Sequence, residues 1–281
     1  MTAISDHDGI EFDAALPQAA SRAQDAWNDL AAGLSQSWIW TALAIQDVKL
    51  RYRGSVLGPL WMTLSTIVMV ATIGVIYSRL FSMPASTYLP YLALGLIIWQ
   101  FISSMFVDGC QTFMAVENII QQVPIAFSVH AYRVVFRNLI GLAHTAIIIP
   151  IGFLFFEMPI GWRTLEIVPG LILLLINGVW ISILFGMISA RYRDVPPIVG
   201  SLLQVLFFAT PIMWPIESLG DMRYIADLNP AYAAVDVIRA PLLGVPVGPY
   251  AWPLLIATTI VCCAGSFAFF ARFRSRIAYW I

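Results

Sequence analysis

Long charge-free runs of apolar residues follow the first 50 residues of the chain. The clearest is the run of 25 residues between Arg53 and Arg79. A helix rises ~1.5 Å per residue, so this run is long enough to cross the ~30 Å hydrocarbon core of a bilayer. Similar runs predict six membrane-spanning helices in all, at about 57–78, 88–107, 138–156, 168–190, 197–214 and 250–271. The sequence therefore predicts an all-α, polytopic membrane protein.

The distribution of basic residues predicts the orientation of these spans. Lysine and arginine are retained on the cytoplasmic side of a membrane, so the Arg53 end of the first span lies inside and the Arg79 end outside. Six crossings then place both termini in the cytoplasm, with eleven basic residues inside and four outside. The inside set is Arg22, Lys49, Arg51, Arg53, Arg133, Arg137, Arg191, Arg193, Arg272, Arg274 and Arg276, and the outside set is Arg79, Arg163, Arg223 and Arg239. This bias predicts a multi-pass protein of the cytoplasmic (inner) membrane.

Two segments precede the first span. Residues 1–33 are predicted to be an acidic cytosolic tail, and residues 34–281 the transmembrane domain. The acids of the tail are Asp6, Asp8, Glu11, Asp13, Asp25 and Asp29, against the single base Arg22. Within residues 36–53, a helical spacing places Trp38, Ala42, Ile45, Val48 and Tyr52 on one face. An aromatic and apolar face beside cations predicts a helix lying in the inner headgroup layer.

The inner loop at 108–133 is too long to be a simple connector. It contains a helix-compatible piece from Thr112 to Gln122, stopped by Val123-Pro124 because the residue before a proline disfavours the helical conformation. A short polar helix here would be a docking surface. The alternative is a loop that rests on the lipid headgroups.

The outer loop at 215–248 predicts a re-entrant helical hairpin. Its first half-helix would carry one apolar face, and Asn229-Pro230 provides an N-cap and a first-turn proline for a second half-helix. Backbone at membrane depth must be helical or buried in protein, so the hairpin should line a cavity or an interface. The face of the first half comprises Leu219, Met222, Ile225 and Ala226, and that of the second Ala231, Val235, Ile238 and Leu242.

Composition excludes several classes of protein. With 60% hydrophobic and 11% charged residues, the chain is neither a soluble receptor nor a nucleic-acid binder. His144 is the only ionisable residue near the middle of a span, which disfavours a proton-coupled carrier. A sodium-coupled carrier with sites built from backbone carbonyls is still an alternative. A lone histidine such as His144 is more typical of a hydrogen-bonded packing residue than of a ligand.

The chain lacks the motifs of ATP hydrolysis and of membrane-embedded catalysis. A phosphate-binding loop needs a glycine directly before its lysine. The only lysine of the chain, Lys49, directly follows Val48. Membrane enzymes gather Asp, Glu or His at one surface, whereas Asp108 and Glu117 are isolated here and the histidines are scattered. We therefore expect no catalytic, cofactor or metal site in this chain.

Three stretches together resemble the permease subunits of ABC exporters for lipid-linked polysaccharides, the family of O-antigen, capsule and wall teichoic acid exporters. The first stretch is Lys49, Arg51, Tyr52, Arg53, Ser55, Leu57, Gly58 and Trp61. The second is Arg191-Tyr192-Arg193-Asp194-Val195 with Thr210-Pro211-Ile212-Met213-Trp214-Pro215 downstream, and the third is Leu228-Asn229-Pro230. The resemblance covers about Trp38 to the C-terminus.

The resemblance implies a homodimer bound to two copies of a separate ATPase chain, which binds ATP and Mg. The substrate path would lie at the dimer interface between the first and fifth spans. The inner loop would hold the coupling helix, and the outer hairpin the gate helices. The implied coupling residues are Glu117, Asn118, Gln121, Gln122 and Pro124, and the implied gate residues are Met222, Ile225, Asn229, Pro230 and Val235. Family members often carry cations where this chain has the uncharged Gln121 and Gln122, and this is a departure from the family pattern.

The substrate itself predicts two further sets of residues. Aromatic rings offer apolar faces to sugars, and the candidates for a channel lining are Trp61, Tyr77, Phe207, Phe208 and Trp214, with an interfacial belt or core packing as the alternative. Guanidinium groups suit the lipid pyrophosphate. The candidates are Arg133 and Arg137, which share a helix face, and Arg51 and Arg53 at the same depth, with topological anchoring as the alternative.

The predicted function is that of a transmembrane subunit in an ATP-driven exporter, which moves a lipid-linked, O-antigen-like polysaccharide outward across the inner membrane. One alternative is an exporter of a drug or small lipid, with a narrower and more aliphatic dimer seam. The other is a membrane enzyme of glycan-lipid assembly, which would require acids clustered at one face.

Overall fold

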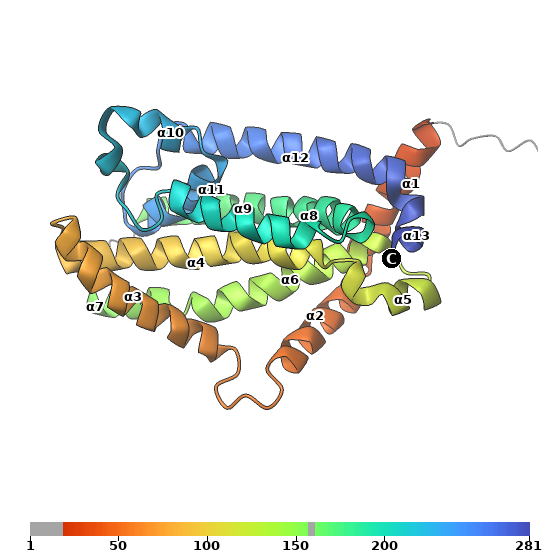
Figure 1. Cartoon of the computed structure of the whole chain (residues 1–281), viewed down its shortest axis with the longest axis horizontal. Helices are drawn as coiled ribbons and strands as arrows, with labels where there is room; N and C mark the ends of the chain where they lie inside the picture. Colours follow the sequence, from red (N-terminus) through yellow and green to blue (C-terminus); the bar gives the residue numbers. More distant parts are fainter. Residues whose placement is uncertain (1–18, 157–160) are drawn as a thin grey trace, which may run out of the picture.

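In the computed structural model, the described residues are 19–156 and 161–281, and they form helices with no strand among them (Figure 1). The all-α prediction is confirmed. In chain order the elements are α1 Ala19–Ser35, α2 Ser37–Arg51, α3 Leu60–Leu80, α4 Ala85–Cys110, η1 Met114–Val116, α5 Glu117–Gln122, α6 Phe127–Thr145, α7 Ile148–Phe155, η2 Trp162–Glu166, α8 Ile167–Arg191, α9 Val195–Ala209, η3 Ile216–Met222, α10 Arg223–Asp227, α11 Pro230–Leu242, α12 Ala251–Phe273, η4 Arg274–Arg276 and α13 Ile277–Trp280.

Five helical segments within the described ranges are long and apolar enough to cross a membrane. They include α3, α4, the pair α6 and α7, α8 with its preceding turn, and α12 with its C-terminal extension. The fifth predicted span, 197–214, is instead the shorter apolar helix α9 followed by an irregular loop. The chain is a multi-pass membrane protein, and the count of six crossings stays a prediction.

The third span begins earlier than the charge-free run indicates. Helix α6 starts at Phe127, so residues 127–133, expected in the inner loop at 108–133, are already helical, and Arg133 and Arg137 lie on one helix as predicted. The helix tolerates them because their charges are paired within the protein. After α6, a break separates Thr145 from α7, where Pro150 lacks the N–H needed to continue the ladder of hydrogen bonds.

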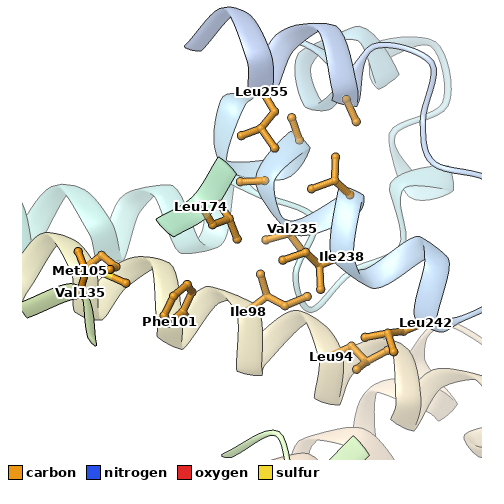
Figure 2. Packing of buried hydrophobic residues seen from close by; sticks show 14 residues of the cluster. Leu94, Ile98, Phe101, Met105, Val135, Leu174, Val235, Ile238, Leu242 and Leu255 are labelled. Atoms are coloured by element: carbon orange, nitrogen blue, oxygen red, sulfur yellow. The ribbon is translucent and has the colours of Figure 1, made fainter. Parts of the chain in front are cut away.

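Helix α4 is the centre of the bundle. It packs against α3, α6, α8, α9 and α11, and 61% of its apolar window is buried, against 22% for α3. Figure 2 shows Leu94, Ile98 and Phe101 of α4 meeting Leu174 of α8 and Val235 and Ile238 of α11, with Leu255 of α12 closing the cluster. Helices α3 and α9 each pack against α4 and leave most of their own side chains exposed or half-buried.

The acidic tail predicted at 1–33 requires a correction. Residues 1–18 lie outside the described residues, but Ala19–Ser35 form helix α1, which packs on α6 and α12. Ala26, Leu30 and Gly33 face inward at helical spacing. Charge counting missed this helix because its apolar stripe is narrow and its partners are far away in the sequence.

The interfacial helix predicted at 36–53 is α2. Trp38, Ala42 and Ile45 of the predicted apolar face are exposed, whereas Trp40 and Ala44, on the other side, pack against α6. An apolar face that no protein covers is compatible with the predicted place in the headgroup layer. The chain then turns into α3 through Gly54 and Gly58, whose φ values of 84° and 54° favour glycine (Figure 1).

The outer hairpin differs from the prediction in its first half. Gly220, at φ 52° and ψ −124°, interrupts η3, so residues 215–227 form no single helical face. Met222 and Ile225 are exposed while Ala226 is buried. The second half, α11, is buried on all sides between α4, α8 and α12. Whether the hairpin enters the outer leaflet stays a prediction.

The helices give the bundle two distinct ends (Figure 1). We call the end with α1, α5 and α13 the termini end, and the end with η3, α10 and α11 the far end. The turn between α8 and α9 lies at the termini end, and the segment from η3 to α10 lies at the far end.

Candidate functional site

The short helix α5 projects from the termini end. Asn118, Gln121, Gln122 and Pro124 are exposed on it and on the turn that follows, and Glu117 is half-buried. Val123 has φ −127° and ψ 123°, so the helix ends before Pro124 as predicted. Ile120 packs against a hydrophobic cluster to which α1, α6, α8, α12 and α13 contribute. All five predicted coupling residues therefore lie together on an accessible surface.

Asp29 ties three distant segments together beside α5. Its side chain is fully buried, and its carboxylate accepts hydrogen bonds from the amides of Phe127 at 3.2 Å and Ser128 at 2.9 Å. It also pairs with Nε of Arg274 at 2.8 Å. A carboxylate at the N-terminus of α6 satisfies free N–H groups and meets the positive end of the helix dipole. The position of α1 therefore depends on one buried acid.

A second network of charges joins α2, α4 and α6. Asp47 binds Nε of Arg133 at 2.7 Å and Nη1 of Arg137 at 2.9 Å. Arg137 also reaches Asp108 of α4 at 3.0 Å, and Asn138 donates to the same carboxylate oxygen at 3.1 Å. We call these five residues the α2–α6 network.

The electrostatics of the α2–α6 network keep Asp47 ionised. Burial raises the pKa of the Asp47 carboxyl, but the hydrogen bonds and charges of Arg133 and Arg137 outweigh burial, so its pKa lies below the ordinary value of 3.8. The network therefore holds α2 against the bundle throughout the neutral pH range.

The structure brings the predicted phosphate-binding arginines into one region but gives them different surroundings. The side chains of Arg133 and Arg137 are each 15% exposed and are paired with carboxylates. Arg51 is more open, with 47% exposure and a longer contact of 3.5 Å to Asp108, and Arg53 is exposed. Phosphate binding stays a prediction, and the two exposed arginines are the more accessible of the four.

The five predicted channel aromatics fall into two groups. Trp61 on α3 and Phe208 on α9 are 58% and 64% exposed. Tyr77 stacks on Phe81 and Phe207 contacts Trp99, so these two rings are packed in the protein. Trp214 is half-buried and donates from Nε1 to the carbonyl of Phe208 at 3.2 Å. Trp61 and Phe208 are therefore the most exposed of the five candidates.

At the far end, the loop Thr210–Pro215 breaks the helical backbone, and side chains of α4 and α11 bind its carbonyl groups. The Tyr88 hydroxyl donates to the carbonyl of Met213. Tyr91 donates to the carbonyls of Pro211 at 3.2 Å and Trp214 at 3.0 Å.

Helix α11 completes this arrangement. Arg239, 2% exposed, donates to the Pro211 carbonyl at 2.8 Å, and its guanidinium lies 4.1 Å from the centre of the Tyr91 ring. Asn229 donates to the Thr210 hydroxyl at 3.0 Å. Irregular backbone inside a membrane protein needs such internal partners. We call Tyr88, Tyr91 and Arg239 the carbonyl clamp.

The predicted gate residues have different roles in this arrangement. Asn229 caps α11 by accepting from the amide of Ala231 at 2.9 Å, and Pro230 occupies the first turn, both as predicted. Val235 is fully buried in the core, so it contributes packing. Met222 and Ile225 remain exposed on the surface of the far end. A gating role for these residues stays a prediction.

Several residues of these networks were missed by sequence reasoning. The sequence places Asp29 in the tail, indicates that Asp108 is an isolated acid of the inner face, counts Arg239 among the outer bases, and gives Asp47 no role. A signal existed for Asp47, because it lies on the face of α2 opposite the predicted apolar stripe. His144 was interpreted correctly as a packing residue, since its Nδ1 lies 2.7 Å from the carbonyl of Ile140.

Comparison with known proteins identifies the family. Residues 40–243 match the family model described as "ABC-2 type transporter". The chain belongs to the ABC-2 type transporter family. The matched region begins within α2 and ends just after α11, so it contains α5, the α2–α6 network and the carbonyl clamp. Helices α1 and α12 lie outside it.

The relatives of this ABC-2 chain include curated permeases. It is 24% identical over 185 residues to "O-antigen export system permease protein RfbA" of Myxococcus xanthus, covering 64% of this chain and 69% of that protein. Two proteins of the same name from Klebsiella pneumoniae are 23% identical over 239 residues, covering 83% of this chain and 91% of the relative, and 25% identical over 191 residues, covering 66% and 72%. The ABC-2 chain is thus similar to permeases named for O-antigen export, and it is a transporter component.

Proposed function

We propose that this chain is the transmembrane subunit of an ATP-driven exporter, which moves a lipid-linked, O-antigen-like polysaccharide from the cytoplasmic side to the outer side of the inner membrane. The observation that carries the proposal is the family match over residues 40–243, together with relatives named as O-antigen export permeases. The termini end would face the cytoplasm, in accord with the distribution of basic residues.

The energy source in this proposal is a separate ATP-binding subunit, which holds ATP and Mg, and the chain itself hydrolyses no ATP. Helix α5 supports this assignment because it projects from the termini end, contacts α13 and packs through Ile120 against a hydrophobic cluster of the bundle. A push on α5 would therefore be transmitted to that cluster. The exposed Gln121 and Gln122 would dock through hydrogen bonds and shape, since neither carries a charge.

The exporter would be a homodimer with the substrate path between α3 and α9 of the two copies. Both helices pack against α4 and expose apolar side chains, among them Trp61 and Phe208. The sugar chain would slide along these exposed rings, and the exposed Arg51 and Arg53 would meet the lipid pyrophosphate at the inner leaflet.

One observation favours a second candidate, an exporter of a small lipid or drug. Most exposed side chains on the same two helices are aliphatic, among them Leu64, Val68 and Val75 on α3 and Leu202 and Val205 on α9. An aliphatic seam suits a lipid chain better than it suits a polymer of hydroxyl groups. The two candidates differ in whether a glycan reaches the cell surface.

The experiment is deletion of the gene in its host, with the surface glycan measured by antibody or periodate staining and the lipid-linked precursor measured inside the cell. We expect surface glycan to disappear, precursor to accumulate, and wild-type chain to restore export. Unchanged surface glycan in the deletion strain would rule out the proposed function and leave the small-lipid exporter.

The coupling assignment has its own test in the same strain. A chain with Asn118→Glu and Gln121→Glu places two negative charges on α5, so it should insert normally but fail to restore export. The matched control is Gln24→Glu, an exposed glutamine of α1 at the same end. Full export by the double variant would exclude α5 as the docking surface.

A further inference from the structure

The far end contains a cavity of about 550 Å³ within a single copy of the chain. It lies between the beginning of α4, the loop that enters the hairpin, and α11. Its volume falls in the range of roughly 300–1,000 Å³ that is usual for small-molecule sites. The polar side chains on its wall come from Ser86, Thr87, Tyr91, Glu217, Arg223, Tyr232, Asp236 and Arg239.

Arg239 is the deepest cation of this cavity. It is 2% exposed, and no carboxylate of the described residues lies within ion-pair distance of it. Its hydrogen bond to the Pro211 carbonyl uses one nitrogen, whereas a guanidinium has five N–H groups to donate. A buried cation with donors to spare is costly unless something else accepts from it.

Two acids face the same space without an ion-pair partner in the described part of the chain. Asp236 is 6% exposed, and it accepts from the amide of Gly248 at 2.8 Å and from the Tyr232 hydroxyl at 3.4 Å. Glu217 stands at the exposed rim. The second arginine of the wall, Arg223, lies 3.6 Å from Asp227. The wall therefore offers two cations and two anions, and its formal charge is balanced.

This mixture of groups discriminates between classes of ligand. An anion would meet two carboxylates, and a cation would meet two guanidinium groups. A polyol satisfies both, because each hydroxyl can donate to a carboxylate and accept from an arginine. Pro90, Leu243 and Val245 add an apolar wall against which the C–H faces of a sugar can lie.

We propose that this cavity binds a short segment of carbohydrate, with Arg239 donating to sugar hydroxyls and Asp236 and Glu217 accepting from them. The site is separate from the path between two copies, since one chain supplies every group. The inference rests on the proposed function, because the exported glycan is the carbohydrate that the far end would meet. The site would hold the glycan near the exit of the exporter.

Photo-crosslinking in living cells tests this site with the natural glycan. The photoreactive amino acid p-benzoylphenylalanine is placed at Val245, which lines the cavity and is 48% exposed, or at Leu165, which is 60% exposed at the same end but outside the cavity. After irradiation, the chain is purified and its attached glycan is detected by periodate staining. We expect a yield at Val245 several-fold above that at Leu165.

A second substitution shows whether the yield depends on the cavity. Leu243→Trp fills space in the cavity and replaces no residue of the carbonyl clamp, and it should reduce the yield at Val245 several-fold. The matched control, Leu165→Trp, should leave that yield unchanged. A yield at Val245 that is no higher than at Leu165, or that Leu243→Trp does not reduce, overturns the proposed site.

Export measured in the same cells separates the two proposals. If the photoreactive chains restore surface glycan and the cavity gives no specific crosslink, the carbohydrate site is wrong while the exporter stands. If wild-type chain makes no difference to surface glycan, the proposed function fails and the site fails with it. If Leu243→Trp lowers export without lowering the crosslink, glycan contact at Val245 lies outside the cavity, and the site is again overturned.

Discussion

The two ends of the bundle are held together by different chemistry. At the termini end, side chains pair with side chains of opposite charge, as in Asp29 with Arg274 and Asp47 with Arg133. At the far end, the carbonyl clamp binds main-chain oxygens of an interrupted backbone. Buried pairs of opposite charge are the distinguishing contacts of the first end, and hydrogen bonds to backbone carbonyls are those of the second.

The difference arises because separate helices must be held at one end and unpaired backbone carbonyls must be satisfied at the other. Helices α1 and α2 are separate elements with narrow apolar faces, so charged pairs add the specificity that apolar contact does not supply. The Thr210–Pro215 loop already lies against α4, but its carbonyls lack the partners that a helix would provide. We therefore expect substitutions at the termini end to be more costly and more sensitive to pH.

The largest effect is expected for Asp29→Ala. The substitution leaves Arg274 and two amides of α6 without their partner in a buried site, which costs about 3–5 kcal/mol. Thermal unfolding of the purified chain in detergent measures the loss. Asp25→Ala, an exposed acid of the same helix, should stay within about 0.5 kcal/mol of wild type. Equal melting temperatures for the two variants would contradict the proposed role of Asp29.

Asp47→Asn should have the next largest effect. It keeps the shape of the side chain but removes the charge that faces Arg133 and Arg137, for a loss of about 1.5–3 kcal/mol. The same melting measurement applies, with Lys49→Gln on the exposed side of α2 as the control. If the control destabilises the chain as much, α2 is not held by the α2–α6 network.

Asn229→Ala tests the far end and should cost less. It removes the N-cap of α11 and the bond to Thr210, a loss of about 1 kcal/mol. Asn28→Ala, an exposed asparagine of α1, provides the control for the substitution itself. A loss of stability as large as that of Asp29→Ala would contradict the expectation that substitutions at the termini end are the more costly ones.

The smallest expected effect is a change with pH. Because the folded pKa of Asp47 lies below 3.8, its stabilising contribution is complete above that value and is lost as the pH falls through the folded pKa. The melting difference between wild type and Asp47→Asn should therefore be constant at neutral and mildly acidic pH and shrink below about pH 4. The difference for Asn229→Ala should stay constant over the same range, since no charged group is removed.

Much of the fold was predictable because the relevant signals are local. The apolar runs placed α3, α4, α8 and α12 close to their observed bounds. Val123-Pro124 ended α5 and Asn229-Pro230 began α11, since capping and proline effects act within one turn. The prediction of a single helical face in the first half of the hairpin was wrong, because Gly220 adopts a non-helical conformation that residue spacing does not reveal.

The candidate sites were less predictable. The coupling residues of α5 are neighbours in the sequence, so they were found together. The carbonyl clamp and the cavity join α4 to residues more than 100 positions later, as in Tyr91 and Trp214. No periodicity within one segment reports such a contact.

The sequence alone determined that this is a helical membrane protein, where its long helices lie, and which of its residues resemble an exporter. These properties depend on hydropathy, charge and turn chemistry within single segments. Only the tertiary structure decided which charges are paired. Asp29 lies 245 residues from Arg274, and Asp47 lies 86 residues from Arg133. Whether a polar side chain is exposed, paired or turned into a cavity depends on what packs against it, and that is a property of the whole bundle.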